Sequence, residues 1–167
     1  MCSCKKKKGP IEVGVIDNNS FFYHKFDPSI IVSNEFSLDI NDDSKVDLTF
    51  ENILNGGNLY TEYVAIARPR EGTEIFESGD LVEDFFMNDA IYCNGNYSDA
   101  YALLYASYSS DFGAYTVKGR FRNGDQKYMA FKINDNGKWC LGWIRLSYSN
   151  GKTTVYEYGY KQNMNCK

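Results

Sequence analysis

The stretch YMAFKINDNGKWCLGWIRLSYSNGKTTVYEYGY, residues 128–160, decides the fold class of this chain. It holds three runs rich in strand-forming residues, at 128–133, 139–148 and 155–160. The first turn between them is the cluster 134–137, and the second contains Asn150-Gly151. Asn-Gly is a strong hairpin signal, because both positions tolerate positive φ. Short strands separated by such turns predict an antiparallel meander.

The rest of the domain follows the same pattern. Apolar residues at 46, 48 and 50 alternate with polar residues at 47, 49 and 51, as in a strand with one buried face. Further strands are predicted at 11–15, 21–26, 30–38, 60–67 and 101–108. We therefore predict an all-β fold, an antiparallel β-sandwich that is jelly-roll-like or related, with at most one short helix. Residues 11–167 would form one domain, preceded by a tether at 1–10.

The exception to the strand pattern is the segment 71–88. Ser78-Gly79-Asp80 is a suitable helix cap, and the spacing of Leu81, Val82, Phe85 and Phe86 is helical. The alternative is a loop held in place by the two phenylalanines.

Charge and hydropathy exclude two classes of partner. The net charge is −4 and the pI is about 5.0, whereas a nucleic-acid binder needs a basic stripe. No apolar stretch approaches the roughly 18 residues that a transmembrane helix requires. The domain is therefore expected to be soluble, or held at a membrane by something other than a helix.

The cysteines bear on location. Cys93, Cys140 and Cys166 lie in the domain, so at most one disulfide forms among them, with the pairing open. Cys4 follows a small residue and precedes the basic run 5–8, which is similar to the lipidation site of a bacterial lipoprotein. The alternative is a cytosolic start with a solvated basic tail. We expect the first: a lipid anchor at Cys4 and a location in the bacterial cell envelope, periplasmic or on the outer membrane.

The segments 36–50 and 128–160 together resemble uncharacterised all-β secreted and lipid-anchored proteins of Bacteroidetes-type bacteria. The shared features are an aspartate-rich strand-loop-strand and a C-terminal meander with a Gly-Trp strand, here Gly142-Trp143. The resemblance covers less than half of the chain. It implies an extracytoplasmic β-sandwich and no particular activity. On physical grounds, Gly142 would allow a neighbouring strand to approach closely, and Trp143 would fill the core between the sheets.

The segment 39–47 is the one place where oxygen-bearing side chains are regularly spaced. In the pattern D-x-N-x-D-x-x-x-D, side-chain oxygens of Asp39, Asn41, Asp43 and Asp47 and the carbonyl of Lys45 would bind Ca²⁺, a hard cation that takes six to eight oxygens. Ser44 replaces the usual glycine, and Phe50 stands where an EF-hand has glutamate. A polar hairpin loop without metal is the alternative. A bound ion would join two strands rather than catalyse a reaction.

No catalytic motif is recognisable, and the single histidine, His24, lies in an aromatic strand. We therefore expect a non-enzymatic envelope lipoprotein domain with a binding or structural role. Its lipid anchor would hold it at the membrane, and its partner would be a glycan or a surface protein. One alternative is a carbohydrate-binding module with a tyrosine platform at Tyr156, Tyr158 and Tyr160, although cross-strand tyrosine pairs can simply stabilise a sheet. Another is a glycan-active enzyme with an unidentified carboxylate pair.

Overall fold

The computed structural model describes residues 9–16, 20–162, 164 and 166, and these contain fourteen strands and no helix. The first seven strands are β1 (Ile11–Glu12), β2 (Phe21–Val32), β3 (Glu35–Leu38), β4 (Leu48–Gly57), β5 (Tyr60–Pro69), β6 (Thr73–Ser78) and β7 (Leu81–Val82). The other seven are β8 (Ala90–Ile91), β9 (Tyr97–Ser98), β10 (Ala102–Ser110), β11 (Tyr115–Lys118), β12 (Lys127–Asp135), β13 (Lys138–Ser149) and β14 (Lys152–Lys161). The predicted all-β class is confirmed.

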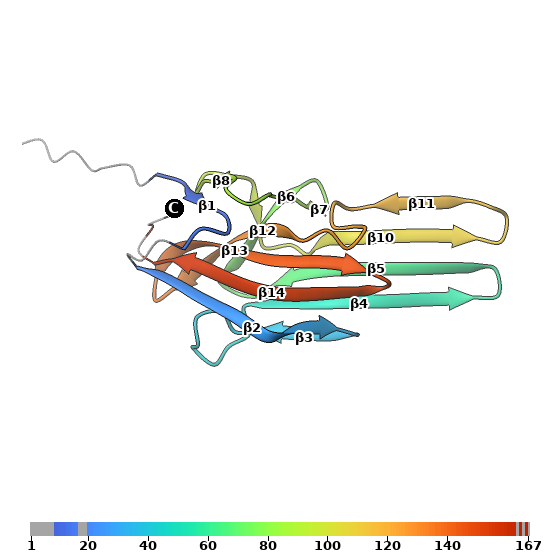
Figure 1. Ribbon diagram of the computed structural model, residues 1–167, viewed down its shortest axis with the longest axis horizontal. Coiled ribbons are helices and arrows are strands. Elements are labelled where there is room, and N and C mark those ends of the chain that lie inside the picture. The colour runs from blue at the N-terminus through green and yellow to red at the C-terminus, as the bar shows by residue number, and fades with distance from the viewer. Residues whose placement is uncertain (1–8, 17–19, 163, 165, 167) are drawn as a thin grey trace, which may run out of the picture.

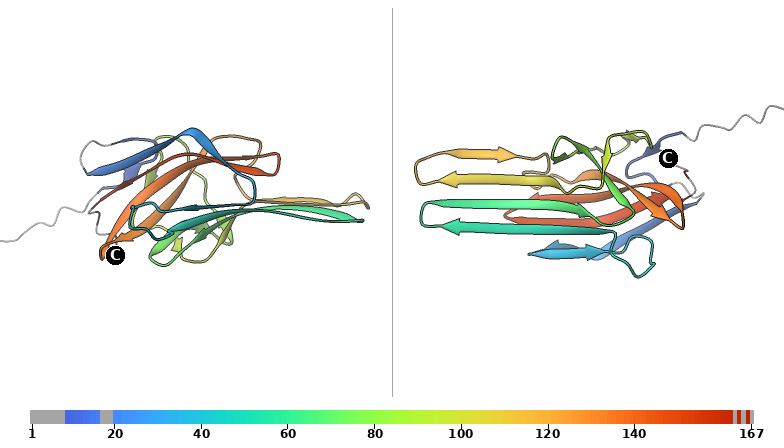
Figure 2. Two further views of the ribbon diagram at one scale, coloured as in Figure 1. Left: turned by 90° about the horizontal axis from the view of Figure 1, so that it is seen from below. Right: turned by 180° about the vertical axis from the view of Figure 1, so that it is seen from behind.

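The strands hydrogen-bond in the order β2-β14-β13-β12-β6-β7-β10-β5-β4-β3, with β11 beside β10 and β9 beside β6. Every pairing is antiparallel except the short one between β7 and β10. The sheet turns back on itself at β6 and β7, so β2, β14, β13 and β12 form a first layer and β10, β5, β4 and β3 a second. Figure 2 shows the two layers facing each other, as in a sandwich.

The second layer is longer than the first. The hairpins β4–β5 and β10–β11 continue past the ends of β13 and β14 as a flat projection, called the blade below (residues 53–64 and 105–118; Figure 1). The strand β1 lies at the opposite end of the molecule (Figure 1).

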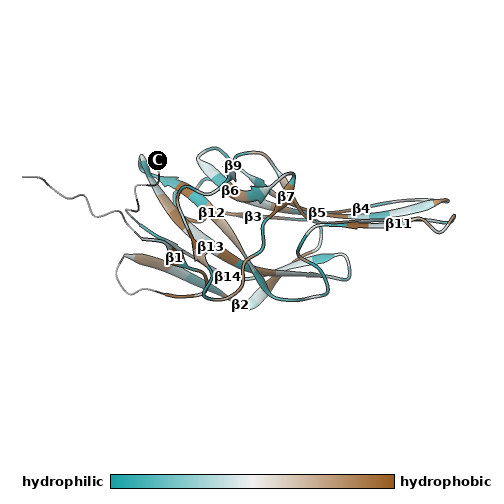
Figure 3. Cartoon of the chain, turned by 90° about the horizontal axis from the view of Figure 1, so that it is seen from above, coloured by the Kyte–Doolittle hydropathy of each residue, from teal (hydrophilic) through white to brown (hydrophobic). Residues whose placement is uncertain are grey.

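The main core lies between the layers. Its largest fully buried side chains include Phe50 from β4, Phe131 from β12, and Phe121 from the segment between β11 and β12. Figure 3 shows the apolar residues that β12, β13 and β14 contribute. Burying one such side chain contributes about 1.5–3 kcal/mol, which is why the alternating apolar positions determine the faces of these strands.

Trp143 is fully buried, but not between the layers as expected. Along β13 the residues Cys140, Ile144 and Leu146 face the main core, so Leu141 and Trp143 point to the other face. There they form a second cluster, covered by the N-terminal segment and by the C-terminal residues. The expectation for Trp143 was wrong because a period of two identifies two faces without saying which one meets the second layer.

Gly142 does allow a close approach. A Cβ on Gly142 would lie against the ring of Phe131 and 2.7 Å from the carbonyl oxygen of Gly159 on the adjacent strand. The prediction for this residue is confirmed.

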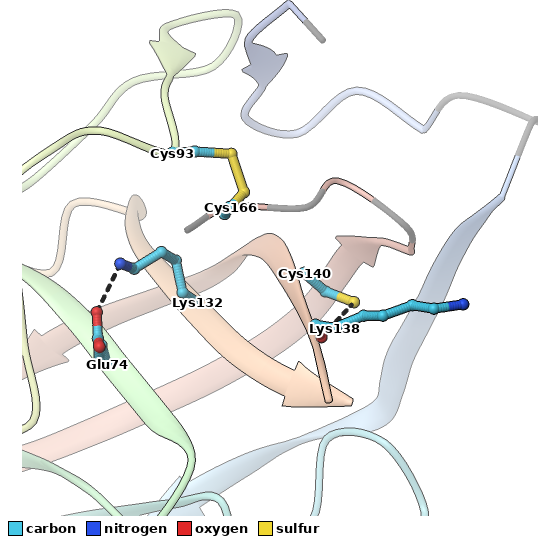
Figure 4. The surroundings of a disulfide bond; sticks show 6 residues. All are labelled: Glu74, Cys93, Lys132, Lys138, Cys140 and Cys166. Atoms are coloured by element: carbon cyan, nitrogen blue, oxygen red, sulfur yellow. Dashed lines mark hydrogen bonds and ion pairs between the residues drawn. A yellow bond between two sulfur atoms is a disulfide. The ribbon is translucent and has the colours of Figure 1, made fainter. Parts of the chain in front are cut away.

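A disulfide closes the second cluster. Cys93 is bonded to Cys166, which ties the end of the chain to the segment after β8 (Figure 4). Cys140 is a buried thiol that donates a hydrogen bond to the carbonyl of Lys138. One disulfide and one remaining thiol agree with the prediction that three domain cysteines form at most one disulfide.

The segment 71–88 is not helical. It contains β6 and β7, and Phe85 forms an isolated β-bridge with Tyr128. Phe85 packs against the second cluster, whereas Phe86 is exposed. The helical spacing was misleading because Leu81 and Val82 pair with β6 as a strand. Cys4 and most of the predicted tether lie outside the described residues.

Candidate tyrosine-lined binding site

A groove runs along the inner face of the blade where the first layer ends. Its walls are four tyrosines from four strands: Tyr63 on β5, Tyr105 on β10, Tyr115 on β11 and Tyr148 on β13. We call this surface the tyrosine trough. Its two halves have volumes of about 490 and 440 Å³ and share Tyr105, Tyr115 and Tyr148. Each half is within the size range of small-ligand sites.

The strand period explains why these side chains gather here. In β5, Ala65 and Ala67 face the main core, so Tyr63 and Thr61 lie on the same face further along the strand. The first layer stops at the turn Asn150-Gly151, and beyond it the inner face of β5 has no opposing sheet (Figure 2). Thr61 and Tyr63 therefore face the trough, although the same face of β5 is covered by the first layer further along the strand.

The floor of the trough is small and polar. Ser107 lies opposite Tyr63 in the β5–β10 ladder, and Ser109 lies opposite Thr61. On the other side of β10, Ser109 pairs with Tyr115. Hydroxyl groups between ring walls offer hydrogen-bond donors and acceptors at the bottom of an aromatic groove.

Two tyrosines join the layers. The rings of Tyr105 and Tyr148 stack with their centroids 4.2 Å apart and an angle of 25° between their planes. Burial raises the pKa of Tyr148 to about 12, and the nearby phenols of Tyr105 and Tyr63 add to the effect. A hydrogen bond with Tyr105 raises the pKa of Tyr115. Tyr148 and Tyr115 are therefore neutral hydroxyl groups at physiological pH.

The β13–β14 turn closes one end of the trough. Asn150 and Gly151 both have positive φ, 51° and 76°, as the Asn-Gly hairpin signal predicted. A Cβ on Gly151 would lie 3.1 Å from the Tyr63 ring, so glycine lets this turn pack closely on the blade.

The platform predicted at Tyr156, Tyr158 and Tyr160 is not present. Tyr158 and Tyr160 are 4% and 2% exposed and belong to the main core. A β-bulge between Val155 and Glu157 breaks the alternation, so that Tyr156 is an extra residue. The prediction was wrong because one inserted residue changes which face the following side chains occupy.

Tyr156 belongs to a polar group on the outer face of the first layer. Its hydroxyl is 2.9 Å from that of Ser147, and its ring lies below the guanidinium of Arg145. Arg145 also pairs with Glu157 at 3.2 Å, and Glu157 accepts a hydrogen bond from Tyr23. These side chains contact one another across β2, β13 and β14, which suits a structural role.

In the acidic loop between β3 and β4, the side-chain oxygens bind the loop's own amides. Asp39 accepts hydrogen bonds from the amides of Asp43 and Ser44, at 3.2 and 2.8 Å. Asn41 accepts from Asp43, and Asp43 from Lys45. Ser44 adopts a left-handed φ of 69° despite its side chain. Such self-bonding is typical of a stable turn without metal.

Asp47 differs from the other residues of the loop because it is buried. Its carboxylate accepts a 2.7 Å hydrogen bond from the amide of Ile40, which is itself fully buried. Burial raises the pKa of Asp47, the Ile40 amide opposes the shift, and the charges of Asp39 and Asp43 add to it. No group of three or more Asp, Glu, His or Cys side chains with metal-site geometry occurs among the described residues. Calcium binding by this loop stays a prediction.

The sequence analysis did not predict the trough. Its four tyrosines, Tyr63, Tyr105, Tyr115 and Tyr148, are spread over the sequence and lie on four different strands. A usable signal was the length of the two hairpins: strands that continue beyond their apolar positions expose their inner face.

Comparison with known proteins adds no assignment. No protein-family model, curated protein or solved structure matches this chain. In the part of the chain that the structure describes, no helix is long and apolar enough to cross a membrane.

Proposed function

We propose that this chain is a non-enzymatic binding domain of the bacterial cell envelope and that it binds carbohydrate in the tyrosine trough. The observation that carries the proposal is the combination of four tyrosine walls with a floor of serine and threonine hydroxyls. Aromatic rings offer flat apolar surfaces to sugar rings, and hydroxyl groups exchange hydrogen bonds with sugar hydroxyls.

The composition of the trough favours sugar over an apolar ligand. Tyr115 is 68% exposed, so its ring is accessible to a ligand without rearrangement. The remaining lining includes Thr61, Ser107, Asn123 and Asn150, which are polar and uncharged. None of the described lining residues is Asp or Glu. The enzyme alternative would therefore have to recruit its carboxylate pair from outside the trough.

The test is calorimetric titration of the domain with oligosaccharides from bacterial, plant and host polysaccharides. For a sugar that binds, Tyr115→Ala should weaken affinity about fivefold, equivalent to roughly 1 kcal/mol for one ring contact. Tyr108→Ala is the matched control, because Tyr108 lies on the opposite face of β10 and stacks on Tyr60. Absence of binding at millimolar sugar, or an equal effect of both substitutions, would refute the proposal.

The envelope location has its own support. The Cys93–Cys166 disulfide suits an oxidising compartment outside the cytoplasm. The strand β1 lies at the end opposite the blade, so a tether at the N-terminus would leave the trough directed away from the membrane (Figure 1).

A labelling experiment tests the anchor at Cys4. In cells that express the complete gene, wild-type protein should incorporate labelled palmitate and sediment with membranes. Cys4→Ser should abolish both, whereas Cys2→Ser should leave them unchanged. Equal labelling of wild type and Cys4→Ser would exclude this anchor.

A further inference from the structure

We infer that the ligand of the tyrosine trough is an acidic carbohydrate whose carboxylate or sulfate group binds Arg122. This inference rests on the proposed function and names the chemical class of its ligand. It arises from the charge of the trough, a property on which the carbohydrate proposal does not depend.

Arg122 lies in the segment between β11 and β12 and lines the larger half of the trough with Asn123. Both sides of this segment are anchored. The preceding residue, Phe121, is fully buried, and its amide donates a 3.2 Å hydrogen bond to the carbonyl of Leu104. The amide of Gly124 donates a 3.0 Å hydrogen bond to the backbone carbonyl of Tyr148. The backbone therefore holds Arg122 in a defined place at the trough.

The guanidinium of Arg122 is not neutralised within the described part of the chain. Of the five arginines, Arg68, Arg120 and Arg145 form ion pairs, and Arg70 donates a hydrogen bond to Thr49. Arg122 has neither kind of partner among the described residues. It is also the one charged residue in the lining of either half of the trough. A chain with a net charge of −4 thus places a positive group in its tyrosine-lined groove, and no Asp or Glu is among the described lining residues.

This arrangement suits an anion attached to a sugar. Arginine presents a planar fork of donors that matches a carboxylate or sulfate, often with two parallel hydrogen bonds. The exposed ring of Tyr115 lies in the same lining and can pack on the sugar that carries the anion. The ring walls would then hold the sugar while Arg122 selects its charge.

The test uses three tetrasaccharides: a neutral galactan, a sulfated galactan and a galacturonan. The sulfated and carboxylated probes identify which anion binds. We expect at least one acidic probe to bind about tenfold more tightly than the neutral one, which corresponds to 1.4 kcal/mol. The preference should shrink in 1 M salt, where charges are screened within about 3 Å.

Arg122→Gln should remove the preference, so that the acidic and neutral probes bind with similar affinity. Lys118→Gln is the matched control, since it removes the same charge from the opposite face of β11. Tyr115-dependent binding of all three probes with equal affinity would overturn this inference and leave the proposed function intact. So would an acidic preference that survives Arg122→Gln. Failure of all three probes to bind would also overturn this inference, whereas the proposed function fails only if the wider set of oligosaccharides does not bind.

Discussion

The ring of Tyr105 on β10 stacks on the ring of Tyr148 on β13, and this contact joins the two layers at the point where the main core ends. On one side of the pair lies the apolar core, and on the other lies the open tyrosine trough. The same two residues thus belong to the folding core and to the candidate ligand site. Substitutions at this pair should affect stability as well as binding.

Truncation of Tyr148 should destabilise the domain. Tyr148→Ala removes a ring that is 4% exposed and leaves a cavity at the layer junction, so we expect the free energy of unfolding to fall by about 3 kcal/mol. Tyr148→Phe retains the ring and should cost less than about 1 kcal/mol. Urea unfolding measures both values. Equal losses in the two variants would mean that the hydroxyl, and not the stacked ring, provides the stability.

Gly142→Ala should destabilise the first layer. The added methyl group would press on Phe131 and on the backbone of Gly159, and overpacking of this kind costs about 1–3 kcal/mol. Gly56→Ala is a suitable control, because its nearest heavy atom would be 4.0 Å away. Thermal unfolding should separate the two variants clearly. A Gly142→Ala protein as stable as wild type would show that the layer can expand at this point.

Removal of the disulfide should loosen the second cluster. Cys93→Ser/Cys166→Ser should lower the free energy of unfolding by about 2–4 kcal/mol and the melting temperature by roughly 5–10 °C. Tryptophan emission should shift to longer wavelength, because Trp143 lies beneath the residues that the bridge holds. Dithiothreitol should reproduce these changes in wild type and have no effect on the double variant. A wild type that is insensitive to reduction would contradict the prediction.

The free energy of unfolding of the domain should depend on pH through the carboxyl group of Asp47. Its pKa is raised in the folded state, so folding favours the protonated carboxyl, and stability is lost as pH rises from the ordinary aspartate value through the folded one. Asp47→Asn retains an acceptor for the Ile40 amide and does not titrate, so its stability should lack this decline. Unfolding free energies measured between pH 3 and pH 7 test this. Parallel curves for the two proteins would disprove it.

Calcium binding by residues 39–47 predicts a higher melting temperature for metal-stripped protein in millimolar Ca²⁺ than in the same concentration of Mg²⁺. Asp39→Asn/Asp43→Asn should abolish the difference, because it removes two carboxylates while keeping acceptors for the loop amides. A melting temperature that does not respond to Ca²⁺ in wild type would show that the loop is held by its amides alone.

Local pattern was sufficient for much of the fold. The meander at 128–160 forms as predicted, because its turns contain residues that accept positive φ and its strands alternate in hydropathy. Local pattern was misleading at 78–86. The apolar residues there have a spacing compatible with a helix, but Leu81 and Val82 form the short strand β7. Local pattern also missed β11, a strand that exists through its pairing with β10.

The candidate site was less predictable than the fold. Tyr156, Tyr158 and Tyr160 form a regular alternation in sequence, yet a one-residue bulge places two of them in the core. Arg122 lies in a segment without any motif, and it reaches the trough because the residues on either side of it are bound to β10 and β13.

The amino-acid sequence by itself determined an antiparallel β domain, its principal hairpin turns and the number of possible disulfides, because these depend on neighbouring residues and on simple counts. Tertiary structure decided which face of each strand meets the other layer, where the first layer stops and the second continues, and which cysteines meet. Tyr63 and Tyr148 illustrate the reason: each belongs to an ordinary strand, and the two become walls of one groove when the layers pack with unequal lengths.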